Sequence, residues 1–396
     1  MLNLKERVFA EAEYLVALRR EFHQNPELGL QEHRTARRIE EELERFGVSH
    51  ARVGTTGVLG ILHGTGIGSG VIALRADMDA LPIQETTDTA YRSNVNGVMH
   101  ACGHDAHTAS LLGAAKILAE NKNTFGGEVR LIFQPAEEIG QGVKPFVEAG
   151  ALKNVQRVFG VHTAPDLPVG TVGLKPGLNN AAVDHFKITI HGKSVHVSTP
   201  QLGVDALYIA SQIVVALQAL VTRCTSPVEP VIIGVGKLNA GTTYNALAES
   251  ATLEGTTRTI SQERRMKIQE AVTDAVQHIS EIYGGRADIV WTDFAAPLVN
   301  APQVCLEAAQ VMKHLWGEGK VVTDRALSLG GDNFAEFLLY APGAYAYIGT
   351  GNSAIPDTLN PAHNGNFEID EGALQVATSL YVGYVLAELS DHSIRK

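Results

Sequence analysis

Residues 99–119 read MHACGHDAHTASLLGAAKILA, and this stretch places Cys102, His104, Asp105 and His107 just ahead of an apolar helical pattern. Thiolate, imidazole and carboxylate groups are the ligands that zinc-like transition metals prefer. A helix N-terminus also favours the ionised thiol, because its N–H groups and dipole stabilise negative charge. Taken alone, the same residues are equally compatible with an ordinary helix start, so a metal site needs support from the rest of the chain.

Length and composition describe a globular protein with room for more than one domain. The chain has 396 residues, of which 45% are hydrophobic and 19% are charged. This length is typical of two domains, and this composition supports a substantial buried core. The formal net charge is −11 and no long basic run is present, which argues against nucleic acid as a partner.

The cysteines and the N-terminal residues indicate the cellular compartment of the protein. Cys102, Cys224 and Cys305 are odd in number and widely separated, which argues against a disulfide framework and for a reducing compartment. Residues 1–23 carry charges throughout and have no apolar segment of the signal-peptide type. No stretch approaches the roughly 18 uninterrupted apolar residues of a membrane span. We therefore expect a cytoplasmic protein without membrane association.

Helical and strand-like patterns alternate along the first part of the chain. Apolar residues recur every three or four positions over 4–22, and a second helix is expected over 35–46. The runs 58–62 and 71–76 flank the glycine-rich stretch GTGIGSG, which predicts a hairpin. Further strands are expected at 129–133, 158–161 and 344–348. This alternation predicts an α/β fold, with a largely parallel sheet covered by helices on both faces.

Polar side chains follow the ends of these expected strands. They are Asp77, Asp79, Glu137, Glu138, His162 and, further along, His363. In open α/β sheets, ligands bind beyond the carboxyl ends of the strands. The sequence therefore predicts a functional site at this edge of the sheet.

The middle of the chain follows a different pattern. Strands are expected at 186–190, 231–235, 251–258 and 287–291, with helices at 204–222 and 262–283. The order β-α-β-β-α-β is that of a ferredoxin-like unit. Sequences typical of hinges flank it, Lys175-Pro176-Gly177 before and Ala295-Ala296-Pro297 after. We predict a catalytic domain formed by 1–180 and 295–396, interrupted by an inserted domain at 181–294.

The polar side chains suit a site for two metal ions. The candidate ligands are Cys102, His104, Glu138, His162 and His363. Two divalent ions about 3.5–4 Å apart can share a hydroxide and hold the oxygen of an attacked carbonyl group. A thiolate can bridge them, and thiolate with imidazole selects zinc-like metals. The alternative is that each histidine is satisfied by ordinary hydrogen bonds.

The neighbouring acidic residues have two interpretations each. Glu137 beside a ligating Glu138 could act as a general base toward an activated water, or the pair could simply begin a solvated helix. Asp79 and Asp105 could orient ligand imidazoles, or cap a turn and a helix. His107 lies one turn into the helix, where packing or support of a ligand is expected rather than ligation.

Six motifs occur in order along nearly the whole chain: RREFHQNPELGLQE, LRADMDALPIQE, MHACGHDAHTA, FQPAEE, VFGVHTAPDLPVG and LNPAHNGNFEIDE. With them the chain resembles the amidohydrolase branch of the aminoacylase/carboxypeptidase metallopeptidases, which includes hippurate hydrolases, N-acyl-amino-acid deacylases and auxin-conjugate hydrolases. The resemblance implies a zinc-peptidase-like mixed sheet with helices on both faces, carrying an inserted ferredoxin-like lid and dimerisation domain.

The resemblance also implies a set of functional residues. The metal ligands fall on Cys102, His104, Glu138, His162 and His363, and the general base falls on Glu137. The cofactors are two divalent ions, Zn²⁺, Mn²⁺ or Co²⁺. The wider superfamily has a ligating His-x-Asp where this chain has Asp77-Met78-Asp79, and the thiolate compensates for the missing histidine. We also count Asp79 among the expected catalytic residues.

In the inserted domain, the resemblance implies that His196 polarises the scissile carbonyl, often from the partner subunit of a dimer. Asn245 and Arg258 would hold the substrate carboxylate, which a guanidinium binds bidentately. The chain departs from the usual pattern here. It has SVHVS at 194–198, Pro200-Gln201, NALA at 245–248 and Asp332-Asn333-Phe334, where the family usually has Gly-Gly-His-Ala-Ala, Pro-His, Asn-Val-Ile-Pro and Glu-Asp-Phe. These departures concern substrate identity more than reaction type.

The expected activity is hydrolysis of the amide bond of an N-acyl amino acid, with an N-acetyl, benzoyl or similar group, to a carboxylate and a free amino acid. Glu137 takes a proton from the metal-activated water, and the metals with His196 stabilise the oxyanion. One alternative is a dipeptidase or carboxypeptidase acting on short peptides. Another is a non-catalytic binding protein on the same scaffold. The expected partners are a small-molecule substrate and a second copy of the chain, in a homodimer or higher oligomer.

Overall fold

The computed structural model describes residues 3–390, and the chain divides into two compact units. The first unit takes the residues up to Gly177, Val299–Ala326 and those from Asn333 onward. The second takes Leu178–Leu298 and Leu327–Asp332. The predicted boundaries after residues 180 and 294 lie close to these points, whereas the return of 327–332 to the second unit was not expected. The assignment of the two parts as separate domains stays a prediction.

The first unit is built on an eight-stranded mixed sheet with the order β1-β2-β4-β3-β5-β14-β6-β13. Its strands are β1 (Ser49–Val53), β2 (Gly57–His63), β3 (Val71–Asp77), β4 (Glu128–Gln134), β5 (Arg157–Pro168), β6 (Val172–Gly173), β13 (Val321–Val322) and β14 (Gly343–Gly351). The central neighbours β4-β3-β5-β14 are parallel, while β1, β2 and β4 pair antiparallel. The predicted α/β class with a mixed sheet is confirmed.

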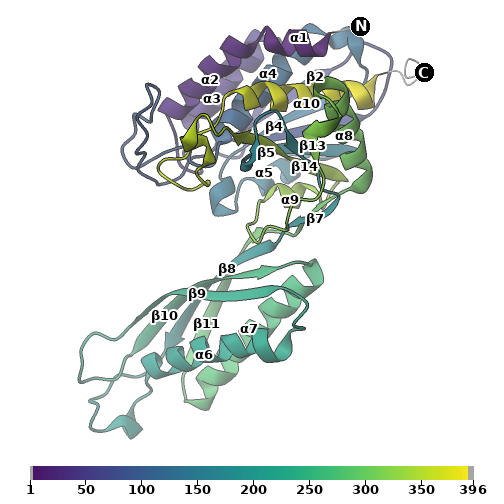
Figure 1. Ribbon diagram of the computed structural model, residues 1–396. Helices are drawn as coiled ribbons and strands as arrows, with labels where there is room; N and C mark the ends of the chain where they lie inside the picture. The colour runs from purple at the N-terminus through teal and green to yellow at the C-terminus, as the bar shows by residue number, and fades with distance from the viewer. Residues whose placement is uncertain (1–2, 391–396) are drawn as a thin grey trace. The chain divides into compact units, whose positions relative to one another are not determined.

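The helices of this unit cover the sheet on both sides. They are α1 (Leu4–Phe9), α2 (Ala12–Gln24), α3 (His33–Arg45), α4 (His104–Glu120), α5 (Val143–Glu148), α8 (Pro302–Trp316), α9 (Phe334–Phe337) and α10 (Gly372–Leu389), with 3-10 turns η1 (Lys122–Thr124), η2 (Glu137–Ile139), η4 (Glu318–Lys320) and η5 (Pro356–Leu359). On β5, Phe159 stacks on Tyr384 of α10, whereas a side chain at Gly160 would meet Phe334 of α9. Successive strand residues face opposite sides, so α10 and α9 lie on opposite faces (Figure 1).

Two local predictions in the first unit were wrong. The stretch 4–22 is two helices rather than one, because Ala10 and Glu11 form a turn between α1 and α2. The strands β2 and β3 do not form a hairpin, because β4 lies between them and pairs with both. The glycine-rich connection instead crosses the backbone before β4. A side chain at Gly64 would lie 2.3 Å from the carbonyl oxygen of Phe125, so only glycine allows this crossing.

The second unit is a four-stranded antiparallel sheet with two helices. Its elements in chain order are β8 (Ala182–His191), η3 (Pro200–Leu202), α6 (Ala206–Cys224), β9 (Val231–Ala240), β10 (Ser250–Thr259), α7 (Gln262–Ile282) and β11 (Arg286–Ala295), and the strand order is β11-β8-β10-β9. This is the ferredoxin-like arrangement that the β-α-β-β-α-β pattern predicts. The short strands β7 (Gly177–Asn180) and β12 (Leu298–Asn300) lie where the chain passes from one unit to the other.

Helix α6 is unusually apolar for a helix with an exposed face. Among the described helices, it is the one long and apolar enough to cross a membrane by length and composition. One face carries Ile209, Ile213 and Leu217 into the core of the second unit. The other leaves Val215 69% exposed, with Leu207 and Tyr208 also exposed. The core of the second unit therefore covers only one face of this helix.

Candidate metal centre

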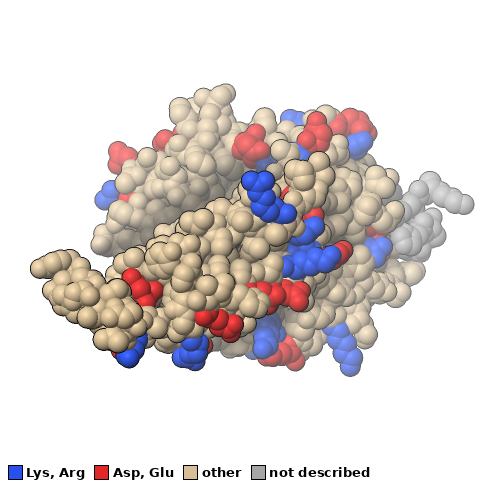
Figure 2. Space-filling view, turned by 90° about the horizontal axis from the view of Figure 1, so that it is seen from below, with Lys and Arg blue, Asp and Glu red and all other residues tan. Residues whose placement is uncertain are grey.

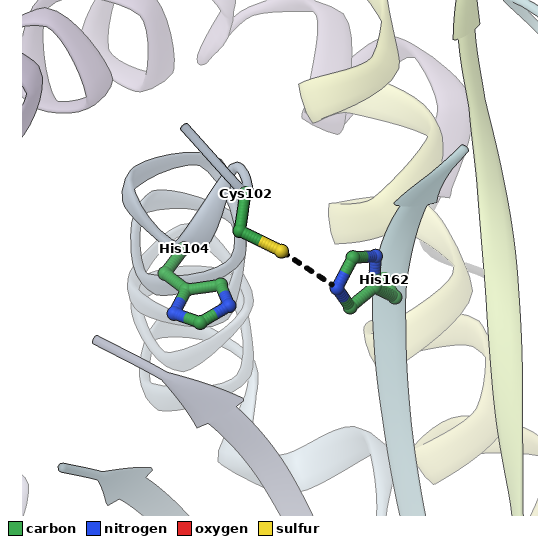
Figure 3. Close-up of side chains that lie close together, drawn as sticks. All are labelled: Cys102, His104 and His162. Carbon is green, nitrogen blue, oxygen red and sulfur yellow. Dashed lines mark hydrogen bonds between the residues drawn. The ribbon is translucent and has the colours of Figure 1, made fainter. Parts of the chain in front are cut away.

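The structure brings the five predicted ligands together at the strand ends of the first unit. Two groups of three side chains each have their ligand atoms within 4.8 Å of one another: Cys102 with His104 and His162, and Cys102 with Glu138 and His363. Figure 3 shows the sulfur of Cys102, which precedes α4, directed at His162 on β5. The distance from Cys102 Sγ to His162 Nε2 is 3.4 Å. A shared thiolate is the arrangement expected for a bridging ligand between two ions.

Backbone geometry makes this convergence possible. Gly103 has φ +88°, and a side chain there would lie 2.6 Å from Thr163 Oγ1. Glycine therefore lets the chain turn into α4 close against β5. The backbone of His363 also lies in the left-handed region, with φ +63°, and its N–H donates to the Ala101 carbonyl at 2.7 Å. Left-handed backbone in a non-glycine residue costs free energy and concentrates at functional sites.

Hydrogen bonds fix which ring nitrogen of each histidine points into the site. His104 Nδ1 donates to the backbone carbonyl of Asp79 at 2.9 Å, and His162 Nδ1 donates to the carbonyl of Thr163 at 2.7 Å. In each ring this leaves Nε2 as the nitrogen directed toward the cluster, where it could ligate an ion. Ligating histidines are typically held in this way by an outer hydrogen bond.

The donor set fits a divalent cation. His104 Nε2 is buried and has no hydrogen-bond partner among the described residues. Glu138 Oε1 is also buried without a hydrogen bond to any described residue, and it lies 3.8 Å from His104 Nε2 and 3.3 Å from His363 Nε2. Such orphaned buried atoms are costly unless an ion satisfies them. Burial and the neighbouring Glu138 carboxylate raise the pKa of the Cys102 thiol, which outweighs the expected effect of the helix N-terminus. The thiolate form therefore needs a cation beside it, and sulfur with imidazole suits zinc-like ions.

Glu137 is held beside this ligand set from two other segments. One of its carboxylate oxygens lies within 4.8 Å of a ring nitrogen of His104 and of a carboxylate oxygen of Glu138. Its Oε1 accepts the backbone N–H of Asn333 at 3.1 Å. The two carboxylate oxygens of Asp79 accept the N–H groups of Glu137 and Glu138, each at 3.0 Å. The side chain expected to act as the base is thus fixed through both its carboxylate and its backbone.

Of the two aspartates expected to orient imidazoles, Asp79 lies against a ligand ring and Asp105 does not. The carboxylate of Asp79 lies 3.4 Å from His104 Nδ1 and also accepts the N–H groups of Glu137 and Glu138, while the Asp79 carbonyl accepts from His104 Nδ1 at 2.9 Å. Asp105 accepts from Arg19 and from the ring of His23, both at 2.8 Å, within a fully buried cluster. The interpretation of Asp105 as an acceptor for a ligand imidazole is therefore wrong.

Asp77 and His107 also lie near His104, but their polar atoms are occupied. Asp77 accepts from Arg75 at 2.7 Å and from His107 Nδ1 at 2.5 Å. His107 Nε2 accepts the N–H of Thr163 at 2.9 Å. With both ring nitrogens used, His107 supports β5 rather than ligating an ion, as its position on the helix predicts.

The second unit holds the three residues expected to contact substrate. Residues 195–197 pair with 245–247, so the segments of His196 and Asn245 lie side by side within this unit. His196 is exposed, and its Nδ1 lies 2.7 Å from the hydroxyl of Ser198. Arg258 on β10 is half-buried, donates to the Leu329 carbonyl at 3.3 Å, and has no carboxylate partner among the described residues.

Several supporting residues were not anticipated. Arg19, Arg75, Gln134 and Asn333 are buried and hydrogen-bonded to residues of the site or its neighbours. One signal was available in the sequence, since Arg75 stands inside an otherwise apolar strand and Arg19 lies on a helix with a buried face. Their partners come from distant segments and could not be assigned from spacing.

A mixed α/β sheet with two thiolate-sharing ligand groups at its strand ends, and a carboxylate beside them, defines a metal-dependent hydrolase. The model of peptidase family M20/M25/M40 matches residues 73–387, and the chain belongs to this family. This confirms the predicted family resemblance and the predicted class, a metallo-amidohydrolase.

Three relatives illustrate the range of the family. The chain is 40% identical to the N-acetyl-L-cysteine deacetylase of Bacillus subtilis, over 91% of this chain and 84% of that one. It is 37% identical to thermostable carboxypeptidase 2 of Saccharolobus solfataricus, over 94% and 95%. The crystal structure of the Bacillus subtilis YXEP protein, a dinuclear metal binding peptidase, matches with a TM-score of 0.80 and 36% identity, covering 96% of this chain and 99% of that one.

Proposed function

We propose that this protein hydrolyses the amide bond of N-acyl amino acids, using two divalent ions held by Cys102, His104, Glu138, His162 and His363. The observation that carries the proposal is the pair of ligand groups that share Cys102, with the Glu137 carboxylate beside them. The dinuclear relative supports two ions, and the deacetylase relative supports an N-acyl substrate. The sulfur and nitrogen donors favour zinc-like ions, and the family resemblance implies Zn²⁺, Mn²⁺ or Co²⁺.

When bound, the two ions supply Lewis acidity that polarises the carbonyl group and makes water a nucleophile near neutral pH. Glu137 accepts a proton from the attacking water and later delivers it to the nitrogen of the departing amino acid. Asp79 acts as a positioning residue in this scheme, because its carboxylate holds the backbone N–H groups of both Glu137 and Glu138. The products are a carboxylate and a free amino acid.

The second unit would supply substrate recognition. His196 would donate a hydrogen bond to the carbonyl oxygen as negative charge develops on it. Asn245 and Arg258 would bind the carboxylate of the amino-acid part, which a guanidinium matches with two parallel hydrogen bonds. The half-buried position of Arg258 supports this role, since its guanidinium has no acidic partner among the described residues and burial lowers its pKa.

A second copy of the chain is the protein partner we propose, through the second unit. The outer face of α6 exposes Val215, Leu207 and Tyr208, and the neighbouring β9 is an edge strand with Ile232 42% exposed. Apolar faces and open strand edges of this kind are typical association surfaces. Light scattering measures the oligomeric state, and turnover is measured on the same sample. A monomer with full activity would contradict the proposal that His196 acts from the partner subunit.

The proposed location is the cytoplasm, and the proposed ligand is a small molecule. All three cysteines are free thiols, as expected in a reducing compartment. On the face shown in Figure 2, Lys and Arg side chains lie among Asp and Glu and do not form a continuous basic surface. Nucleic-acid binding normally requires such a surface.

A matched substrate panel tests the function. N-acetyl and N-benzoyl amino acids are compared with dipeptides of the same C-terminal residue that carry a free amine, each with Zn²⁺, Mn²⁺ and Co²⁺. We expect the N-acyl compounds to give the higher kcat/KM. The carboxypeptidase relative makes a short-peptide hydrolase the second candidate, which a preference for the free-amine dipeptides would establish. If the protein hydrolyses neither the N-acyl compounds nor the dipeptides, the proposal is refuted.

A further inference from the structure

Asn333 lies directly against the proposed general base. It precedes α9, is 1% exposed, and donates its backbone N–H to Glu137 Oε1 at 3.1 Å. Only a proline substitution removes a backbone N–H, but the position of the N–H depends on the side chain that anchors the residue. The anchoring of Asn333 therefore decides where the Glu137 carboxylate sits.

The side-chain amide of Asn333 uses both of its ends. Its Oδ1 accepts from Gln134 Nε2 at 2.8 Å and from Arg75 Nη2 at 3.2 Å. Its Nδ2 donates to the backbone carbonyl of Gln141 at 2.9 Å. An aspartate would keep the two acceptor contacts but would set a carboxylate against the Gln141 carbonyl, which cannot donate.

The Gln141 contact matters because it closes the loop that carries Glu137. The N–H of Gln141 donates to the Ala136 carbonyl, and the N–H of Gly140 donates to the Glu137 carbonyl, both at 2.9 Å. Through its amide, Asn333 thus ties this loop to Arg75, two residues before the end of β3, and to Gln134, the last residue of β4. One residue contacts the base directly and also holds the backbone from which the base projects.

We propose that Asn333 is a positioning residue for Glu137, and that its amide is required there because it donates to the loop and accepts from the strand ends at once. This inference rests on the proposed function, since it concerns the base of that reaction. It also concerns Asp332-Asn333-Phe334, one of the departures from the motifs that the family resemblance implies: in this site the side-chain amide of Asn333 makes both accepting and donating contacts.

Asn333→Asp is the central variant, and Asn300→Asp is its matched control. Asn300 is also fully buried, donates through Nδ2 to the carbonyls of Lys175 and Tyr345, and accepts the Tyr345 N–H at 2.8 Å. The same amide-to-carboxylate change is thus made in the same unit, away from the Glu137 loop. We expect Asn333→Asp to lower kcat by about 10–100-fold, since small misplacements of a catalytic group have effects of this size. KM and bound metal per subunit should stay within about twofold.

A double-mutant cycle separates positioning from a general structural defect. If Asn333 acts through Glu137, Asn333→Asp should have almost no further effect on kcat in a Glu137→Gln background. An equal fold-loss in both backgrounds, loss of metal in parallel with kcat, or a kcat within twofold of that of Asn300→Asp would each overturn the proposal.

A crystal structure of Asn333→Asp adds a readout that needs no turnover. We expect the distance from Glu137 Oε1 to the residue-333 nitrogen to lengthen beyond hydrogen-bonding range, and an unchanged carboxylate position would overturn the proposal. If the wild type hydrolyses no substrate in the panel, the proposed function fails, whereas this structural comparison still decides the positioning role. Should Asn333→Asp not fold, Asn333→Ala, which removes the side-chain donor and acceptor together, carries the same measurements.

Discussion

The surroundings of Glu137 and of His196 differ in how firmly they are held. Glu137 is buried, and its carboxylate and backbone are bonded to Asn333 and Asp79 from two other segments of the first unit. His196 is exposed, and the hydrogen bonds of its ring go to Ser198, two residues along the same loop. A rigid, multiply bonded group can be aimed at one reacting atom, whereas a locally held group can adapt. We infer that the first unit sets the reaction and the second sets the choice of substrate.

The departures from the usual family motifs do not follow this division completely. The segments SVHVS at 194–198 and NALA at 245–248 belong to the second unit, whereas Asn333 and Phe334 of the departure at 332–334 belong to the first. The proposed ligands and Glu137 all lie in the first unit. The comparison of the two units yields four expectations, given in order of size.

Metal removal should have the largest effect. Dialysis against a strong chelator should reduce turnover to background, and Zn²⁺, Mn²⁺ or Co²⁺ should restore it, because the carbonyl would otherwise lose its Lewis acid. Metal content is measured by elemental analysis in parallel with the rate. Full activity in a sample shown to be free of metal would contradict the assignment of the ligand groups.

Replacing the base should have the next largest effect. Glu137→Gln keeps the size of the side chain and should lower kcat by about 10²–10⁴, the usual cost of removing a general base. Bound metal should be unchanged, since Glu137 is not among the five proposed ligands. Turnover within tenfold of the wild type on every accepted substrate would refute the role.

Arg258→Lys tests the second unit. Losing bidentate binding of the substrate carboxylate should raise KM by about 10–100-fold with a smaller effect on kcat, since hydrogen bonds to charged groups contribute about 1.5–3 kcal/mol. The rate on an N-acyl amino acid amide, which lacks that carboxylate, should change little. Arg286→Lys, an exposed residue on β11, is the control. Equal losses on the acid and the amide would contradict carboxylate recognition.

Glu85→Gln should affect stability more than activity. Glu85 accepts from His23, Thr87 and the backbone N–H of Ser93. Burial alone would raise the pKa of Glu85, but these hydrogen bonds lower it overall. Burial and Arg19 oppose charge on His23, yet Asp105 and Glu85 raise the pKa of His23 overall. The pair should therefore be fully charged in the folded protein between the unfolded values of about 4.3 and 6.5.

The pH dependence of that variant follows from these directions. The contribution of Glu85 to the free energy of unfolding is lost as pH falls through its lowered pKa in the folded protein. The contribution of His23 is lost as pH rises through its raised pKa in the folded protein. Glu85→Gln should thus cost about 1–3 kcal/mol near pH 5–6 and less at both extremes. Urea unfolding at several pH values measures this, with the exposed Glu13→Gln on α2 as control. A constant difference across the range would show that the pair is not charged.

Much of the fold could be predicted because its signals are local. Apolar spacing located most strands and helices, and the β-α-β-β-α-β order identified the topology of the second unit. The hairpin prediction between β2 and β3 was wrong because β4, far along the chain, pairs with both. Strand neighbours depend on contacts between distant segments, which periodicity does not report.

The fold class, the family and the candidate ligand set could be inferred from the amino-acid sequence, because strand patterns and the short motifs after strand ends consist of consecutive residues. Three contacts could be found only from the tertiary structure. Two ligand groups share Cys102, Asp105 accepts from Arg19, and Asn333 donates to Glu137, 196 positions away in the chain. The reason is physical: hydrogen-bond partners are chosen by packing, and packing joins residues whose separation in sequence carries no information about their distance in space.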